Sequence, residues 1–229
     1  MNDRAWLSGA RLMLLFTPEL CRRHAPLDAL ERTLESIDAI QIRPKALGST
    51  APGGARETFD WCVRVLDLLE SKGARHIPVI VNDRVDVAEA LRDRGCAGVH
   101  LGQDDCPVRI ARQRLGLGPV IGLSTHDMLQ VANAGEEQID YLGFGPIHGT
   151  RTRGYEHGLG PETAWIASAG SSLPVFAIGG VDASNAADLA RVGRAAVGSA
   201  ILSAEDPGRA AREIRSLLED QGRSSIASP

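Results

Sequence analysis

Short apolar runs alternate with amphipathic segments along most of the chain. The runs are rich in Val, Ile, Leu and Ala and are too brief for buried helices, which is typical of parallel strands covered on both faces. The stretches between them have helical periodicity, with apolar faces over residues 85–91 and 186–190. The pattern predicts repeated strand and helix units, with strands over residues 11–17, 37–43, 77–82, 98–101, 120–124, 141–145, 175–180 and 195–199.

Eight strands in this arrangement favour closure into a (β/α)8 TIM barrel, an α/β fold whose active-site residues follow the C-terminal ends of the strands. The alternative, a doubly wound Rossmann sheet, requires a Gly-x-Gly-x-x-Gly turn after the first strand, where this chain has none. A length of 229 residues suits one barrel. We therefore expect a single domain over residues 1–229, with a short N-terminal extension (1–10) and a frayed C-terminal tail (222–229).

Charge and cysteine content exclude several classes of protein. The net charge of -4 provides no basic surface for nucleic acid or an anionic membrane. The apolar run at residues 12–16 is too short to cross a membrane and lacks the small-residue cleavage site of a signal peptide. The four cysteines form no CxxC pair, which indicates reduced thiols. We expect a cytoplasmic protein that binds neither nucleic acid nor membrane.

Three polar residues share one face of the predicted second strand. Gln41, Arg43 and Lys45 point the same way because strand side chains alternate. Arginine binds phosphate as a planar fork and lysine as a point charge, so the triplet suits a phosphate or pyrophosphate. A lone triplet of this kind is more typical of an edge strand whose charges lie in water. The prediction of an anion site therefore depends on the other strand ends.

Carboxylates follow the third and fourth predicted strands. Asn82 and Asp83 end one run, and Asp105 comes shortly after the other. Two carboxylates from neighbouring strand ends, completed by water and phosphate oxygens, are the usual protein share of a magnesium site. The alternative is that Asp83 caps the next helix and that Asp104 or Asp105 caps the helix through Val108 and Ile110.

Further polar groups follow the fifth strand. Ser124, His126 and Asp127 could face the same end of the barrel. Helix capping explains Ser124 and Asp127 equally well, and a lone histidine such as His126 is more often structural than catalytic.

The last three strands end in groups that suit a second anion. The long loop over residues 145–161 carries hydroxyl and guanidinium groups that could fold over a phosphate. Glycines at the ends of the seventh and eighth strands are typical of the phosphate site of a TIM barrel. The candidate residues are Thr150, Thr152 and Arg153 in the loop and Gly179, Gly180, Gly198 and Ser199 at the strand ends.

In this order the motifs resemble those of the thiamine-phosphate synthases, in the superfamily that also holds the thiazole tautomerases. The likeness extends over about residues 12–217. It rests on Gln41-x-Arg43-x-Lys45, Val81-Asn82-Asp83, Val99-His100-Leu101-Gly102-Gln103-x-Asp105, Gly122-x-Ser124-Thr125-His126, Gly145-Pro146-Ile147, Ala177-Ile178-Gly179-Gly180 and Ser199-Ala200-Ile201.

The resemblance implies a transferase that joins 4-amino-2-methyl-5-hydroxymethylpyrimidine diphosphate to thiazole phosphate and releases pyrophosphate. It implies that Gln41, Arg43, Lys45 and Asn82 hold the pyrimidine diphosphate, that Asp83 and Asp105 bind Mg2+, and that Ser124 lies beside the reacting centre. It also implies that Thr150, Thr152 and Arg153 contact the substrates, and that Gly179, Gly180, Gly198 and Ser199 hold the thiazole phosphate. Arg43, Lys45, Ser124 and Arg153 would then contribute to catalysis.

Three positions depart from the family pattern. Pro44 replaces an acidic residue and removes a backbone donor, so the second strand should end there. Gly149 replaces a proline, and Arg153 replaces the lysine expected on the pyrophosphate.

Two other functions are compatible with the same barrel. In a thiazole tautomerase, His126 would be the acting residue, but such an isomerase has no need of Lys45, Asn82, Asp83 and Asp105. In a non-catalytic barrel that binds phosphorylated ligands, the three departures would mark a decayed site. In every case the expected partners are small phosphorylated molecules, and association into a homo-oligomer is left open.

Overall fold

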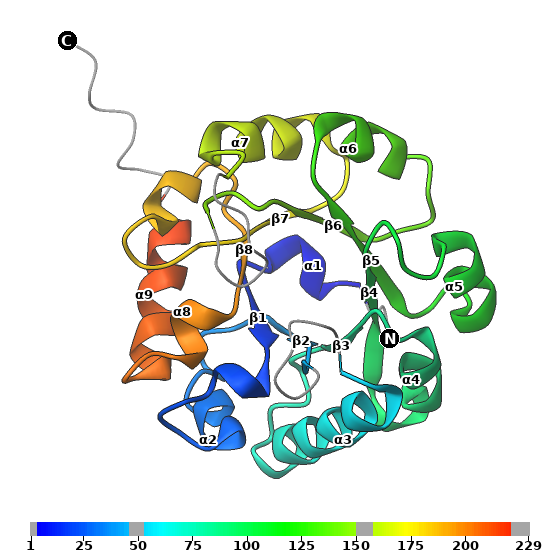
Figure 1. The fold of residues 1–229 in the computed structure, drawn as a ribbon, viewed down its shortest axis with the longest axis vertical. Coiled ribbons are helices and arrows are strands. Elements are labelled where there is room, and N and C mark those ends of the chain that lie inside the picture. The colour runs from blue at the N-terminus through cyan, green and yellow to red at the C-terminus, as the bar shows by residue number, and fades with distance from the viewer. Residues whose placement is uncertain (1–3, 46–52, 150–157, 221–229) are drawn as a thin grey trace.

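The protein folds into a closed barrel of eight parallel strands, as the computed structural model shows for residues 4–45, 53–149 and 158–220. Each strand pairs with the next along the chain, and the last strand pairs with the first (Figure 1). The strands are β1 (Leu12–Phe16), β2 (Ala39–Ile42), β3 (Val79–Asn82), β4 (Cys96–Leu101), β5 (Val120–Thr125), β6 (Tyr141–Phe144), β7 (Val175–Ile178) and β8 (Ala195–Val197). The predicted (β/α)8 TIM barrel is confirmed.

Helices surround the barrel (Figure 1). They are α2 (Pro26–Glu31), α3 (Ala55–Ser71), α4 (Val85–Ala90), α5 (Val108–Leu115), α6 (Met128–Ala134), α7 (Pro161–Gly170), α8 (Ser199–Leu202) and α9 (Pro207–Glu219), with short 3-10 turns at η1 (Pro18–Leu20), η2 (Arg92–Arg94) and η3 (Ala186–Leu189). The predicted helical face at 186–190 is buried but forms only a 3-10 turn. Local bonds explain this, because Asp182 and Asn185 hydrogen-bond backbone groups nearby and so compete with a longer helix.

The apolar core has two layers. One layer lies between the strands and the outer helices. The other fills the barrel and contains Met13, Ile80, Tyr141 and Phe176. Leu7, from the short helix α1 (Trp6–Gly9), is buried in this inner layer. The described part of the expected N-terminal extension therefore closes one end of the barrel, where Figure 1 shows α1 inside the ring of strands.

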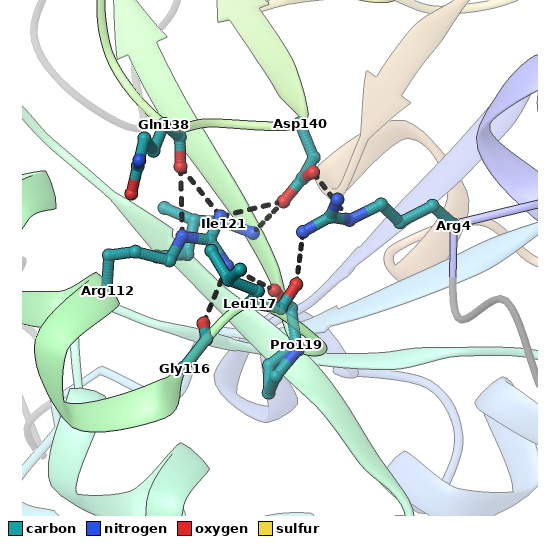
Figure 2. Close-up of polar contacts among 8 residues, drawn as sticks. All are labelled: Arg4, Arg112, Gly116, Leu117, Pro119, Ile121, Gln138 and Asp140. Carbon is teal, nitrogen blue, oxygen red and sulfur yellow. Dashed lines mark hydrogen bonds and ion pairs between the residues drawn. The ribbon is translucent and has the colours of Figure 1, made fainter.

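Buried charges fix the N-terminal ends of the strands. Asp140, just before β6, accepts a hydrogen bond from the Ile121 N–H at 2.8 Å and lies 3.1 Å from Arg112 Nη2 and 2.7 Å from Arg4 Nε (Figure 2). Arg112 also donates to the carbonyls of Gly116, Pro119 and Gln138. These bonds satisfy a buried guanidinium and join α5 to the loops below β5 and β6. This end of a TIM barrel serves stability rather than chemistry.

The cysteines and the helix lengths complete the description of the fold. All four cysteines, Cys21, Cys62, Cys96 and Cys106, are free thiols. Within the described ranges, the helices are too short or too polar to cross a bilayer.

Candidate active site

A cavity that opens to solvent lies at the C-terminal end of the barrel. Its empty space, including the part that is open solvent, is about 860 Å³. Its wall is built from residues at the strand ends and the loops after them, where the fold places active sites. Eight of the predicted site residues line it: Gln41, Arg43, Asn82, Ser124, Gly179, Gly180, Gly198 and Ser199. Residues from all parts of the sequence pattern thus meet at one place.

Three other predicted site residues that the structure describes are not in the cavity wall. Lys45, Asp83 and Asp105 lie in the loops that leave β2, β3 and β4. Thr150, Thr152 and Arg153 lie outside the described residues. Gly149, the last described residue of that loop, is exposed.

The second strand ends as Pro44 requires. The ladder between β2 and β1 continues through Arg43, whose N–H donates to the Phe16 carbonyl at 2.8 Å, and β2 itself stops at Ile42. Beyond the proline, the Lys45 N–H donates to Glu19 Oε2 at 3.1 Å, and Lys45 is buried. Glu19 therefore holds the chain so that Arg43 and Lys45 stay near the end of the strand.

The two acidic residues are not helix caps. The residues that precede α4 and α5 are Arg84 and Pro107, and neither helix has a side-chain cap. Asp105 instead accepts the Gly102 N–H at 2.7 Å. Neither Asp83 nor Asp105 is therefore the N-cap residue of the helix that follows.

Asp83 has an unusual backbone. Its φ of 63° is the one positive value at a non-glycine residue in the described ranges. Such conformations cost energy and concentrate at functional sites. The Asp83 N–H donates to the His100 carbonyl at 2.8 Å, which fixes this residue between the ends of β3 and β4. The backbone thus places Asp83 where β3 and β4 end side by side.

Magnesium chemistry fits this pair of carboxylates. No cluster of three or more His, Cys, Asp or Glu side chains suited to a metal occurs among the described residues. An ion at Asp83 and Asp105 would thus need oxygen ligands from water or substrate, as Mg2+ bound to a diphosphate has.

The polar residues after β5 divide between helix capping and the cavity. Asp127 caps α6, since its side chain accepts the Gln130 N–H at 2.8 Å. Ser124 is no cap, because its Oγ lies 2.9 Å from His100 Nε2. His126 lines the cavity with its Nδ1 2.6 Å from the Gly145 carbonyl. A carbonyl only accepts, so Nδ1 carries the proton, and a neutral His126 keeps Nε2 as an acceptor.

Glycines shape the side of the cavity formed by β7 and β8. Gly179 and Gly180 have φ of 95° and 68°. A Cβ on Gly179 would lie 2.7 Å from Pro146 Cβ, and one on Gly180 would lie 2.7 Å from His148 Cβ. The turn after β7 therefore packs closely against the loop after β6, and the next strand, β8, brings Gly198 and Ser199 to the same cavity. Exposed backbone amides in such a place suit a phosphate.

Sequence reasoning assigned no role to His100 and Tyr141. His100 is 5% exposed, lines the cavity, and has Nδ1 2.9 Å from Tyr141 Oη. Burial raises the pKa of Tyr141 far above its ordinary value of 10.0, against the smaller, opposite effect of a hydrogen bond from Gln41. The phenol therefore stays protonated. The signal that was available is the strand alternation that places His100 and Asn82 on inward faces.

Known proteins resemble the chain over most of its length. Residues 12–202 match the family described as thiamine monophosphate synthase. A thiamine-phosphate synthase of Chlorobium luteolum is 39% identical over 199 residues, which cover 85% of this chain and 88% of that protein. One from Synechococcus sp. is 39% identical over 207 residues and 87% of this chain, yet the chain spans only 55% of that longer protein.

Solved structures agree. The thiamine phosphate pyrophosphorylase from Pyrococcus furiosus superimposes with a TM-score of 0.75 at 27% identity, covering 95% of this chain and 98% of that one. The 3-hexulose-6-phosphate synthase from Salmonella typhimurium shares the fold. Its identity to this chain is 18%, with a TM-score of 0.63 over 91% of this chain and 98% of that one. The chain belongs to the thiamine monophosphate synthase family.

Proposed function

We propose that the protein is a thiamine-phosphate synthase, which joins 4-amino-2-methyl-5-hydroxymethylpyrimidine diphosphate to thiazole phosphate and releases pyrophosphate. The observation that supports the proposal is that groups suited to anions line two different sides of one cavity. Arg43 lines one side, after β2, and the glycine turns after β7 and β8 line another. A reaction between two phosphorylated substrates needs both sites within one cavity.

Roles follow from position. Gln41 and Asn82, which are buried in the cavity wall, would hold the pyrimidine. Arg43 and Lys45 would bind its diphosphate by charge-assisted hydrogen bonds. The thiazole phosphate would lie against Gly179, Gly180, Gly198 and Ser199. Thr150, Thr152 and Arg153 would complete the site from the loop after β6, as the sequence motifs predict.

Asp83 and Asp105 would hold magnesium. Support comes from the finding that neither residue is the N-cap of the next helix and that Asp83 keeps a costly backbone conformation. When bound, the ion supplies charge neutralisation for the departing diphosphate.

The reaction needs little from protein acids or bases. Arg43 and Lys45 stabilise the negative charge that grows on the leaving diphosphate, an electrostatic effect that is often the largest part of catalysis. The C–O bond breaks, its electron pair leaves with pyrophosphate, and the aminopyrimidine delocalises the positive charge left on the methylene carbon. The thiazole nitrogen then gives its lone pair to form the new C–N bond. The chain's main task is to hold the two partners in contact.

A thiazole tautomerase is the second candidate. The position of His126 at the cavity wall favours it, because an isomerase must move a proton and an imidazole can do so. The retention of Lys45, Asp83 and Asp105 weighs against it. A non-catalytic barrel would bind the same ligands without converting them.

Binding to the two halves of the cavity tests the proposal. We expect Arg43→Ala to weaken magnesium pyrophosphate binding by about 10-fold or more, through loss of a charge-assisted bond, with little effect on thiazole phosphate. We expect Ser199→Ala to do the reverse. Calorimetric titration of both ligands into both variants measures this. Loss of the same ligand in both variants would contradict the assignment of two sites.

A further inference from the structure

A line of buried polar side chains leads from the barrel interior to the cavity. Tyr141 Oη lies 2.9 Å from His100 Nδ1, and His100 Nε2 lies 2.9 Å from Ser124 Oγ. Tyr141 is 1% exposed and His100 is 5% exposed. We call these three residues the polar column. Its inner end is apart from the substrate cavity, since Tyr141 is not in the cavity wall.

The barrel makes room for both rings of the polar column. A Cβ on Gly122 would collide with the ring of Tyr141, and a Cβ on Gly143 would lie 3.2 Å from His100 Cε1. Two glycines on the neighbouring strands β5 and β6 thus leave space that the two rings fill. A side chain at either glycine would therefore displace one of the two rings.

Aromatic contacts fix the inner ring. Tyr141 packs edge-on against Phe176 at 5.6 Å and against Trp6 at 6.4 Å between ring centroids. Its hydroxyl therefore stays at one position and faces His100. Burial of a hydroxyl group in an apolar core costs free energy, which the hydrogen bond to His100 must offset.

The donors in the polar column can be assigned a direction. Tyr141 Oη is hydrogen-bonded to His100 Nδ1 at 2.9 Å, and a buried phenol proton left without an acceptor would be costly. The single phenol proton is then given to His100 Nδ1, so the neutral imidazole carries its proton on Nε2. Nε2 donates to Ser124 Oγ, and the hydroxyl proton of Ser124 is left to donate elsewhere.

We propose that Tyr141 is a positioning residue that, through His100, commits the Ser124 hydroxyl to donate its proton into the cavity, toward an oxygen of the departing diphosphate. This inference rests on the proposed function, because that reaction builds negative charge on the leaving oxygen. A donor that is already oriented stabilises such charge without reorganising in the transition state. With the other imidazole tautomer, Ser124 would donate to His100 and turn its lone pairs toward the cavity.

Nitrogen NMR of the wild-type protein tests the direction of the donors. In protein labelled with ¹⁵N-histidine, we expect a His100 signal with a protonated Nε2 and an unprotonated Nδ1, identified by its loss in His100→Gln. A proton on Nδ1 in the wild-type protein would overturn the proposal. This measurement requires no turnover, so it stands or fails separately from the synthase reaction.

Kinetics test the consequence for catalysis. We expect Tyr141→Phe, which keeps the ring, to lower kcat by about 10- to 100-fold with KM changed by less than about 3-fold, since the lost bond acts in the transition state. In a protein that already carries Ser124→Ala, we expect Tyr141→Phe to cause no further loss of kcat, because Tyr141 acts through Ser124. An unchanged kcat, or additive losses in the double variant, would overturn the proposal.

Thr125→Val is the matched control. Thr125 is also buried, and its hydroxyl donates to the Gly143 carbonyl at 3.1 Å, but it lies on the other face of β5 from Ser124. We expect this variant to lose stability comparably to Tyr141→Phe while keeping the wild-type kcat and His100 tautomer. An equal loss of kcat in both variants would assign the effect to packing and overturn the role of Tyr141.

Discussion

At the scale of single residues, the side chains that line the cavity were easier to predict than the backbone conformations that position them. Gln41, Arg43 and Asn82 could be placed in the cavity because strand alternation and the fold fix the direction of their side chains. The conformation of Asp83 could not be predicted, because a positive φ at an aspartate depends on contacts with β4 that no local pattern encodes. Helix capping by Asp83 or Asp105 was equally compatible with the sequence.

Asp83→Asn separates the charge of this residue from its conformation. Asparagine tolerates a positive φ as well as aspartate does, so the variant should fold with an unchanged melting temperature. Loss of a metal-binding carboxylate should lower turnover by about 100-fold or more and raise the magnesium concentration needed. A magnesium titration of turnover measures both. Wild-type magnesium dependence in this variant would contradict the assigned metal site.

At the scale of elements, the strands were predicted to within a few residues because their apolar runs are short and well separated. The polar column could not be predicted, because its residues come from β4, β5 and β6. The two glycines that leave space for its rings can be recognised only in the closed barrel. The helix expected after β7 was wrong in type because local side-chain bonds replaced it with a 3-10 turn.

The contact between α5 and β6 should be essential for stability but not for chemistry (Figure 2). Asp140→Ala leaves Arg112, whose side chain is 6% exposed, without its counter-charge, which should cost about 3–5 kcal/mol in unfolding free energy. The exposed Arg191–Glu162 pair provides the control, because Glu162→Ala should cost no more than about 1 kcal/mol. Urea denaturation measures both. Equal costs would contradict the structural role of Asp140.

Burial of Cys96 in β4 should make stability fall at high pH. Burial raises the pKa of this thiol from 9.0 to about 11. The folded state therefore keeps a proton that the unfolded chain loses, so the contribution to stability is complete below pH 9 and disappears as the pH rises toward 11. At pH 10 the loss should be about 1.4 kcal/mol.

Cys96→Ala isolates this effect from other titrating groups. Its unfolding free energy should fall less steeply than that of the wild type between pH 8 and pH 10.5, because the variant has no thiol to ionise at this position. Parallel slopes in the two proteins would show that Cys96 does not contribute.

At the scale of the whole molecule, closure of the barrel is what turns scattered motifs into one site. Residues from Gln41 to Ser199 meet in one cavity because all eight strands point their C-terminal ends the same way. The count of strands and the missing dinucleotide fingerprint were sufficient to predict this. The role of the N-terminal segment was not predictable, since burial of Leu7 inside the barrel is a tertiary contact without a local signal.

The most direct test of the account is pyrophosphate release by the purified protein. We predict release, together with an equal amount of thiamine phosphate, only when the pyrimidine diphosphate, thiazole phosphate and Mg2+ are all present, and none when EDTA is added. Absence of release with all three components present, accompanied by interconversion of the thiazole isomers, would contradict the synthase function and make His126 the residue that acts.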